Sequence, residues 1–110
     1  MPVINKLDLK EPALVRSAEI AKAIGHPARI AILKILSEKK TCICGDISDQ
    51  LPLAQSTVSQ HLKALKKAGL ITGEVEGVKT CYCLNPDGIK ELKHFLTNLS
   101  DELNEADICC

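Results

Sequence analysis

Residues 56–71, STVSQHLKALKKAGLI, carry a helical pattern that ends in a glycine. Val58, Leu62 and Leu65 recur at i, i+4 and i+7, so they share one face of a helix that we expect over about residues 54–68. Gly69 then ends the helix, because glycine readily adopts the left-handed conformation that closes a helix. The other side chains in its first half are polar and are expected to face outward: Ser56, Thr57, Ser59, Gln60, His61 and Lys63. The stretch therefore predicts the second helix of a helix-turn-helix.

The neighbouring segments extend this pattern. A short helix is expected before it, over about residues 44–50, so the helix-turn-helix spans about 44–69. After it, apolar and polar residues alternate on both sides of a turn at Glu76-Gly77, which predicts a β-hairpin over about 71–84.

Two helices are expected upstream. The first begins between Asp8 and Pro12 and ends at Gly25. Its apolar stripe consists of Leu14, Ala18 and Ala21. The second begins at His26-Pro27, with proline at its first position, and the polar SEKK of residues 37–40 is expected to break it.

A last helix is expected over about residues 86–107, beginning after Asn85. Its apolar residues step by three and four along the chain: Ile89, Leu92, Leu96, Leu99, Leu103 and Ala106. Such a seam serves either the chain's own core or a second subunit. We favour subunit pairing, because a chain of 110 residues buries only a modest share of its surface alone.

The bulk composition is that of one globular domain over residues 1–110. The net charge is zero, but residues 1–40 carry eight Lys/Arg against four Asp/Glu, and residues 71–110 carry three against eight. A DNA-binding patch is compatible with this split, whereas strong non-specific DNA binding is not expected. Aromatic residues are too few for a single-strand stacking platform. No signal peptide or membrane span is recognisable, so we expect a cytoplasmic protein.

The sequence resembles the ArsR/SmtB family of bacterial metal-sensing repressors along nearly its whole length. The matching segments are GHPARIAIL at 25–33, the stretch at 56–71, GVKTCYCL at 77–84, and TCICGDI at 41–47, which resembles the cysteine motif of arsenic- and cadmium-sensing members. The resemblance implies a mainly α winged helix-turn-helix fold with a small β-hairpin. It also implies a homodimer, paired through its first and last helices, that represses its own operon until an ion binds.

The chain departs from the family patterns in four places. The arsenic-type motif Cys-x-Cys-x-x-Cys has Ile47 at its third position, and Ala54 replaces a common capping serine. No cysteine precedes Cys42, unlike in cadmium sensors of the family. His94 lacks the ligand spacing of the zinc site on the last helix, so we expect it to be solvated or to lie at the core edge.

Double-stranded operator DNA is the partner that the helix-turn-helix predicts. Short polar side chains read base edges in the major groove, and lysines hold the phosphates. The candidate base-reading residues are Gln55, Ser56, Thr57, Ser59, Gln60 and His61, and the candidate phosphate contacts are Lys63, Lys66, Lys67 and Lys79. A dimer requires two half-sites about one turn apart, so the operator should be an imperfect palindrome.

Six cysteines fall in three close pairs: Cys42/Cys44, Cys81/Cys83 and Cys109/Cys110. Residues i and i+2 share a face only in an extended strand. If the segment before the helix-turn-helix pairs with the last wing strand, Ile43 points inward with Thr80, Tyr82 and Leu84. The first two cysteine pairs then share the outer face of the sheet. Cys42 and Cys44 are the first-choice metal ligands, and the remaining thiols come from the wing pair or from Cys109/Cys110.

All-thiolate ligation suits soft ions, so arsenite, antimonite or an organoarsenical is the expected inducer, with Cd(II), Pb(II) or Zn(II) as further possibilities. Ion binding at the entry to the helix-turn-helix would then move the recognition helices. Thiol redox sensing and a structural zinc site remain alternatives. A metal-buffering protein without DNA function is a further class. An enzyme is not expected, because no nucleophile has a paired base and no phosphate loop is present in the sequence.

Overall fold

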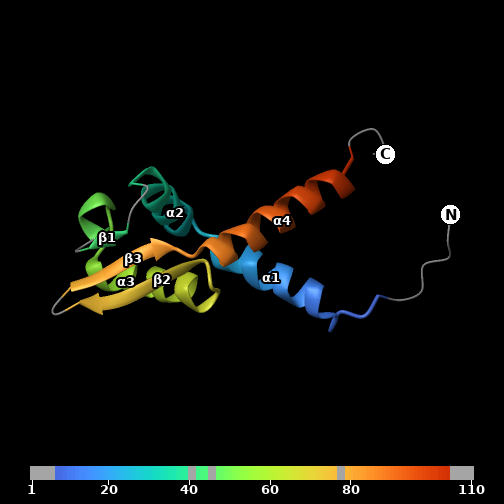
Figure 1. The fold of residues 1–110 in the computed structure, drawn as a ribbon, viewed down its shortest axis with the longest axis horizontal. Coiled ribbons are helices and arrows are strands. Elements are labelled where there is room, and N and C mark those ends of the chain that lie inside the picture. The colour runs from blue at the N-terminus through green and yellow to red at the C-terminus, as the bar shows by residue number, and fades with distance from the viewer. Residues whose placement is uncertain (1–6, 40–41, 45–46, 77–78, 105–110) are drawn as a thin grey trace.

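The computed structural model describes residues 7–39, 42–44, 47–76 and 79–104. Helices and strands follow one another in a winged helix-turn-helix order (Figure 1). They are α1 (Pro12–Ile24), α2 (Pro27–Lys39), β1 (Ile43–Cys44), the 3₁₀ turn η1 (Ile47–Gln50), α3 (Gln55–Lys67), β2 (Ile71–Glu76), β3 (Lys79–Leu84) and α4 (Pro86–Glu102). The predicted recognition helix, its stop at Gly69 and the β-hairpin are confirmed.

The wing hairpin takes up β1 to form a three-stranded antiparallel sheet of order β1-β3-β2. β1 pairs with β3 through Ile43 opposite Tyr82 and Cys44 opposite Cys81. On the other side of β3, Tyr82 lies opposite Gly73, and a Cβ at that glycine would meet the tyrosine ring at 2.8 Å. The ring therefore covers the space that the glycine leaves open.

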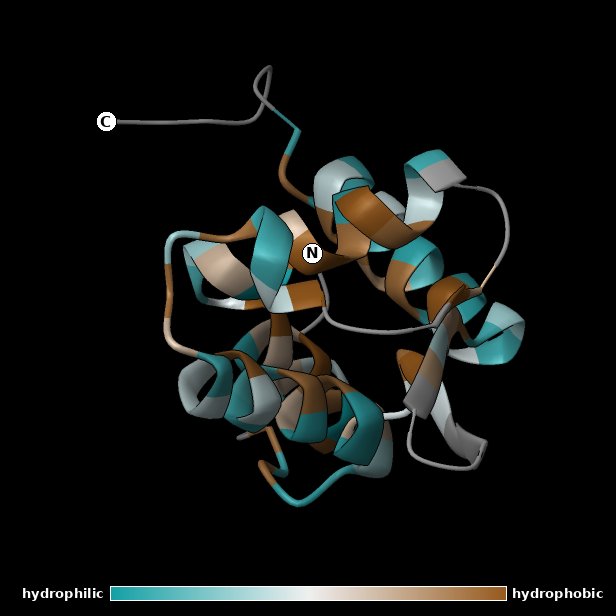
Figure 2. Cartoon of the chain, turned by 90° about the vertical axis from the view of Figure 1, so that its left-hand side faces the viewer, coloured by the Kyte–Doolittle hydropathy of each residue, from teal (hydrophilic) through white to brown (hydrophobic). Residues whose placement is uncertain are grey.

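The core lies between the helices and one face of this sheet. Ile32 and Leu36 of α2 pack with Val58, Leu62 and Leu65 of α3. Ile43, Tyr82 and Leu84 pack against this cluster from the sheet, as the sequence predicted for these three residues. Figure 2 shows both hydrophilic and hydrophobic stretches on the helices, as expected for helices that cover a core on one side only.

A close approach of two backbone segments fixes the start of α4. Gly69, at φ 81°, turns the chain from α3 into β2. The side-chain amide of Asn85 donates a hydrogen bond of 2.8 Å to the Gly69 carbonyl oxygen, and the Asn85 backbone N–H donates one of 3.0 Å to the Leu70 oxygen. Gly88 lies so close that a Cβ there would overlap the Gly69 carbonyl group. The first turn of α4 is therefore held against the end of α3.

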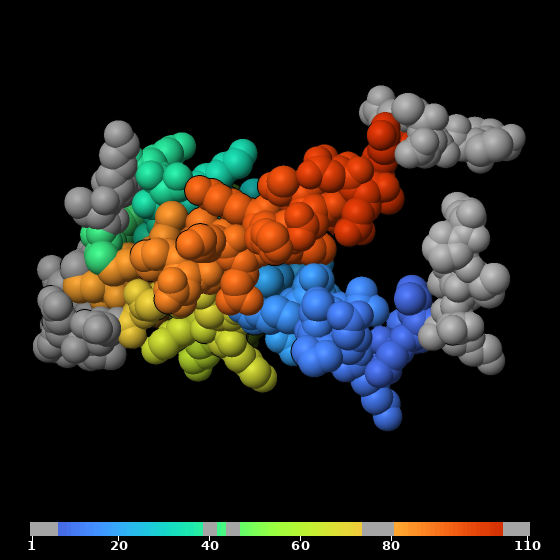
Figure 3. Space-filling model, turned by 45° about the vertical axis from the view of Figure 1, so that its right-hand side comes forward, coloured from blue at the N-terminus to red at the C-terminus, as the bar shows by residue number. Residues whose placement is uncertain are grey.

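Beyond this point α1 and α4 diverge from the body of the molecule (Figure 1), and a notch separates them in the space-filling view (Figure 3). Arg16 of α1 spans the base of the notch. Its guanidinium donates to both carboxylate oxygens of Glu91, at 2.8 and 3.1 Å, and to the Ala68 carbonyl oxygen at 2.8 Å. Within the described part of the chain, no helix is long and apolar enough to cross a membrane.

Three predicted elements are wrong in part. Residues 44–50 do not form one helix, because the chain stays extended at Ile43–Cys44 to pair with β3 and then makes only a 3₁₀ turn. Helix α2 continues through the predicted SEKK break as far as Lys39, since exposed polar residues are tolerated on its outer side. Helix α4 ends at Glu102 rather than near residue 107, and Ala106 lies outside the described residues.

The apolar stripe predicted for the first helix does not face the core. Leu14, Ala18 and Ala21 are exposed, whereas Ile20 and Ala23 are the buried residues of α1. The apolar residues predicted to share one side of α4 are likewise only partly buried. Ile89 and Leu92 are half-buried, and its far half is exposed: Leu96, Leu99 and Leu103.

Replacing Gly88 by alanine should lower the free energy of unfolding by about 3 kcal/mol or more, because the new Cβ must displace backbone rather than a side chain. Urea unfolding followed by circular dichroism measures this loss. The exposed Lys90→Ala, two residues along the same helix, is the control and should change stability by less than about 0.5 kcal/mol. Equal stability of the two variants would contradict the close approach.

Candidate nucleic-acid interface and thiol site

The first half of α3 presents a polar surface. Gln55, Ser56, Ser59 and Gln60 are exposed and Thr57 is half-buried, as the sequence predicted for outward-facing residues. Ala54 is the N-cap and has no side-chain oxygen to offer the first amide groups of the helix. No side chain therefore caps the start of α3, where the Thr57 N–H donates to the Ala54 carbonyl oxygen at 3.0 Å and where the helix dipole favours an anion such as a DNA phosphate.

The lysines proposed to contact phosphates occupy different positions. Lys63 and Lys67 are exposed on α3, and Lys67 lines a groove toward α1. Lys66 is exposed too, but its ammonium group donates a hydrogen bond of 3.2 Å to the Gly73 carbonyl oxygen, which ties α3 to the wing. Lys79 lies on β3, and its side chain is outside the described part of the structure.

The expectation that His61 faces outward is wrong. This side chain is only 9% exposed, and it lies on the inner side of α3 against two residues near the start of α2. Arg29 donates from Nε to His61 Nδ1 at 3.0 Å, and the rings of His26 and His61 lie 4.3 Å apart between centroids. At i+3 from Val58, position 61 still falls within the apolar face of the helix.

Burial lowers the pKa of His61 below its ordinary value, and the neighbouring His26 and Arg29 lower this pKa further. His61 is therefore held neutral, which agrees with its acceptance of a hydrogen bond at Nδ1. Sequence reasoning missed the part that Arg29 plays, although this residue stands within the GHPARIAIL segment that carries the family resemblance.

The register agrees with the prediction that the cysteine positions share one face of the sheet, but Cys81 is only 8% exposed and is therefore buried rather than on an outer face. Cys42 and Cys83 form a disulfide between residues 41 positions apart, with Cα atoms 4.4 Å from each other. Next to them, Cys44 and Cys81 are register partners, and the sulfur of Cys81 is itself disulfide-bonded. Because opposite residues of an antiparallel pair share a face, the four positions gather on the side of the sheet away from Ile43 and Tyr82.

The structure represents the oxidised state of these thiols. With Cys42 and Cys83 bonded to each other, their sulfurs are not ligands, and no group of three or more His, Cys, Asp or Glu among the described residues is arranged to hold a metal. Reduction would return thiols that a soft ion can bind. Cys109 and Cys110 lie outside the described residues, so the proposed contribution of the tail stays a prediction.

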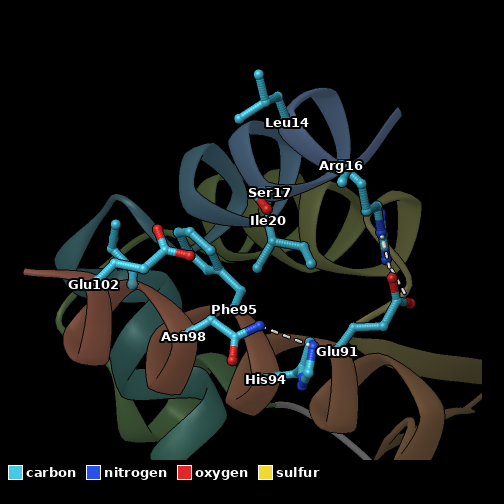
Figure 4. A pocket seen from close by; sticks show the side chains of 11 residues that line it. Leu14, Arg16, Ser17, Ile20, Glu91, His94, Phe95, Asn98 and Glu102 are labelled. Atoms are coloured by element: carbon cyan, nitrogen blue, oxygen red, sulfur yellow. Dashed lines mark hydrogen bonds and ion pairs between the residues drawn. The ribbon is translucent and has the colours of Figure 1, made fainter. Parts of the chain in front are cut away.

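A pocket of about 360 Å³ occupies the notch between α1 and α4. Ile20 of α1 and Phe95 of α4 lie between the two helices, and Glu91, His94 and Asn98 also line the pocket from α4 (Figure 4). His94 is exposed and shares a hydrogen bond of 2.9 Å with Asn98, which agrees with the solvated histidine that the sequence predicted.

The sequence of this chain is similar to those of known transcriptional regulators. Residues 26–72 match the model of the family described as bacterial regulatory protein, arsR family. An uncharacterised helix-turn-helix transcriptional regulator of Methanocaldococcus jannaschii is 43% identical over 80% of this chain and 94% of its own length. The arsenical resistance operon repressor of Bacillus subtilis is 34% identical over 94% of this chain and 88% of its own length.

The fold is also shared with solved structures. The homodimeric winged helix-turn-helix DNA-binding domain of a Mycobacterium bovis protein superposes with a TM-score of 0.66 at 24% identity, covering 98% of this chain and 99% of that one. This likeness establishes the shared fold.

The oxidised protein should be more stable than its Cys42→Ser variant by about 2–4 kcal/mol, because the Cys42–Cys83 bond closes a long loop in the unfolded chain. Urea unfolding without reductant measures the difference, with Cys109→Ser as the control that should match the wild type. A Cys42→Ser variant as stable as the wild type would show that the bond does not form.

The free energy of unfolding should fall as the pH drops below about 6.5, partly through His61. With its pKa lowered in the folded state, His61 binds fewer protons there than in the unfolded chain, so acid favours unfolding. The contribution is fully present above the unfolded pKa and is lost toward the lower folded one. Unfolding at pH 5.5, 6.5 and 7.5 should give a shallower pH slope for His61→Asn than for the wild type.

Proposed function

This chain belongs to the ArsR family of transcriptional regulators, and we propose that it is a repressor whose operator is released when a soft metal or metalloid binds its cysteine thiolates. The family and fold are those of DNA-binding regulators rather than enzymes. The inducer, the ligand set and the operator contacts are the parts that the proposal adds.

Operator binding is assigned to the exposed half of α3. Gln55, Ser56, Thr57, Ser59 and Gln60 supply hydrogen-bonding groups suited to base edges. Lys63 and Lys67, with Lys79 on the wing strand, are assigned to phosphates. Lys66 joins them only if it exchanges its contact with the Gly73 carbonyl group for a phosphate. His61 is left out of the base-reading set because it is buried.

A homodimer would bring two copies of α3 to the two halves of an imperfect palindrome. We assign its interface to α1 and α4, where apolar side chains remain exposed in the single chain. Among them are Leu14, Val15, Leu96, Leu99 and Leu103, with exposures between 40% and 66%. Such a concentration on two adjacent helices marks an interaction surface.

The register of β1 against β3 is the observation that carries the inducer proposal. It places Cys44 opposite Cys81, and the bonded pair Cys42 and Cys83 lies next to them, so the reduced sheet would offer up to four thiolates. Arsenite or antimonite needs two or three thiolates, and Cd(II), Pb(II) or Zn(II) accepts four. Cys81 or Cys83 of the wing would thus replace the third thiol of the arsenic-type motif, which is absent here because Ile47 occupies its position. Similarity to the arsenical resistance operon repressor of Bacillus subtilis favours the metalloid.

The location of the thiols suggests how binding reaches the DNA. β1 precedes η1 and α3 in the chain, and β3 is a strand of the wing. An ion held between them fixes the spacing of the wing relative to the recognition helix. Release requires only that the ion bind the DNA-free arrangement better, by about 1–3 kcal/mol.

Thiol redox sensing is the second candidate, and the Cys42–Cys83 disulfide favours it specifically. A two-electron oxidant would join the same strands that an ion would bridge. The two functions use the same cysteines but differ in the chemical signal.

Fluorescence anisotropy of labelled DNA from the region upstream of the gene tests both candidates. Fully reduced protein should bind, and arsenite should weaken binding by about 5- to 150-fold. The Cys42→Ser/Cys44→Ser double variant should bind DNA as the wild type does but no longer respond. Cys109→Ser/Cys110→Ser is the matched control and separates the sheet from the tail as the source of thiols.

The possible outcomes distinguish ion sensing from redox sensing and from metal buffering. Release by diamide but not by arsenite, antimonite or Cd(II) would replace ion sensing with redox sensing. Ion binding without any DNA binding would favour a metal buffer. Loss of DNA binding in the Cys42→Ser/Cys44→Ser variant would contradict a purely inducer-sensing role for these thiols.

A further inference from the structure

We propose that Arg29 and His61 are positioning residues for DNA binding, and that they hold the recognition helix in its DNA-reading orientation only while His61 is neutral. Neither residue needs to touch DNA for this role. The proposal rests on the DNA-binding activity of the family and is independent of which inducer the cysteines sense.

Arg29 connects three helices. Its Nε donates to His61 Nδ1 on α3 at 3.0 Å. Its Nη1 donates to the backbone oxygens of Lys22 and Ala23 at the end of α1, at 3.4 and 3.3 Å. Because the guanidinium is planar and rigid, these contacts fix the angle between α1 and α3 as well as their separation.

His26 completes the arrangement from the loop between α1 and α2. Its Nδ1 accepts a hydrogen bond of 3.0 Å from the Ala28 backbone N–H and so caps the start of α2. With its own ring held in place, it packs against the ring of His61 at 4.3 Å and a tilt of 40°. His61 therefore meets one fixed partner at Nδ1 and another across its ring face.

This cluster lies directly behind the DNA-facing surface. Ser59 and Gln60, two of the residues assigned to base reading, immediately precede His61 on the same helix. Packing of Val58, Leu62 and Leu65 holds α3 against the core, but apolar contacts are not directional. The part-buried hydrogen bond from Arg29 to His61 in the middle of the helix is directional and so restricts the rotation of α3, which determines where the base-reading side chains point.

Protonation would reverse the central contact. While Nδ1 accepts from Arg29, the ring proton sits on Nε2 and the ring is neutral. A proton added at Nδ1 removes the acceptor that Arg29 uses. It also places a positively charged imidazolium next to the positively charged guanidinium of Arg29. The groups that act on His61 are His26 from the loop and Arg29 from α2, both basic. Glu19 and Lys22 of α1 and Lys67 of α3 line the adjoining groove with Arg29.

The pH dependence that we predict for DNA affinity is opposite in sign to that of most DNA-binding proteins. A protein usually binds the DNA polyanion more tightly as it becomes more positive in acid. Here acid should weaken specific binding, because the charged form of His61 is incompatible with the oriented helix. A merely structural contribution to folding would not give this profile in protein that remains folded.

The test uses a labelled duplex selected from a random pool by the wild-type, fully reduced protein at pH 7.5, with no metal present. Dissociation constants are measured by anisotropy from pH 5.5 to 7.5 at constant ionic strength. Circular dichroism at each pH restricts the comparison to folded protein. We expect a progressive loss of wild-type affinity as the pH drops from 7.5 to 5.5.

Two variants separate the roles. Asparagine places its side-chain oxygen near the position of Nδ1 and does not titrate, so His61→Asn should keep wild-type affinity at pH 7.5 and lose the pH dependence. Arg29→Met should weaken binding about tenfold or more at every pH. His94→Gln removes an exposed histidine elsewhere and should retain the wild-type profile.

Wild-type affinity that stays constant or rises as the pH falls would overturn the proposal. A His61→Asn variant that keeps the wild-type pH profile would overturn it as well, as would an Arg29→Met variant with normal affinity. If Arg29→Met does not fold, His61→Asn alone decides. Loss of the arsenite response has no bearing on these measurements, because no ion is added.

Discussion

β1 pairs antiparallel with β3, with Ile43 opposite Tyr82 and Cys44 opposite Cys81. Only two residues of β1 take part, yet they join the segment before the recognition helix to the last strand of the wing. The same pairing sends Ile43 and Tyr82 to the core and the cysteines to the other face. One register therefore sets both the packing of the domain and the geometry of its thiols, since a slip by one residue would exchange the two faces.

The recognition helix is held by interactions of two kinds. Val58, Leu62 and Leu65 supply burial, which favours contact without choosing an orientation. Directional contacts add the orientation: Arg29 with His61 on the inner side and Lys66 with the Gly73 carbonyl group toward the wing. Signals that reach the wing through the thiols and signals that reach His61 as protons would thus act on the same helix from opposite sides.

Contacts between segments far apart in the sequence explain why two sequence-based predictions, for His61 and for residues 44–50, were wrong. The polar appearance of His61 suggested solvent, but its position three residues after Val58 turns it toward α2, where Arg29 and His26 satisfy it. A short helix was expected over residues 44–50, but Ile43–Cys44 pairs with β3 as a strand. In both cases a partner distant in sequence outweighed the local preference.

Local patterns in the sequence were enough to predict the order of the main elements, the recognition helix, the hairpin and the alternation that places the cysteines on one side of a strand. These properties follow from local periodicity, from glycine at a positive φ, and from proline at helix starts. Tertiary structure alone decided which cysteine faces which, that His61 is buried beside Arg29, and that Gly88 must admit the Gly69 carbonyl group. Each of these contacts joins residues that are far apart along the chain, so local sequence patterns cannot predict that they lie close together in space.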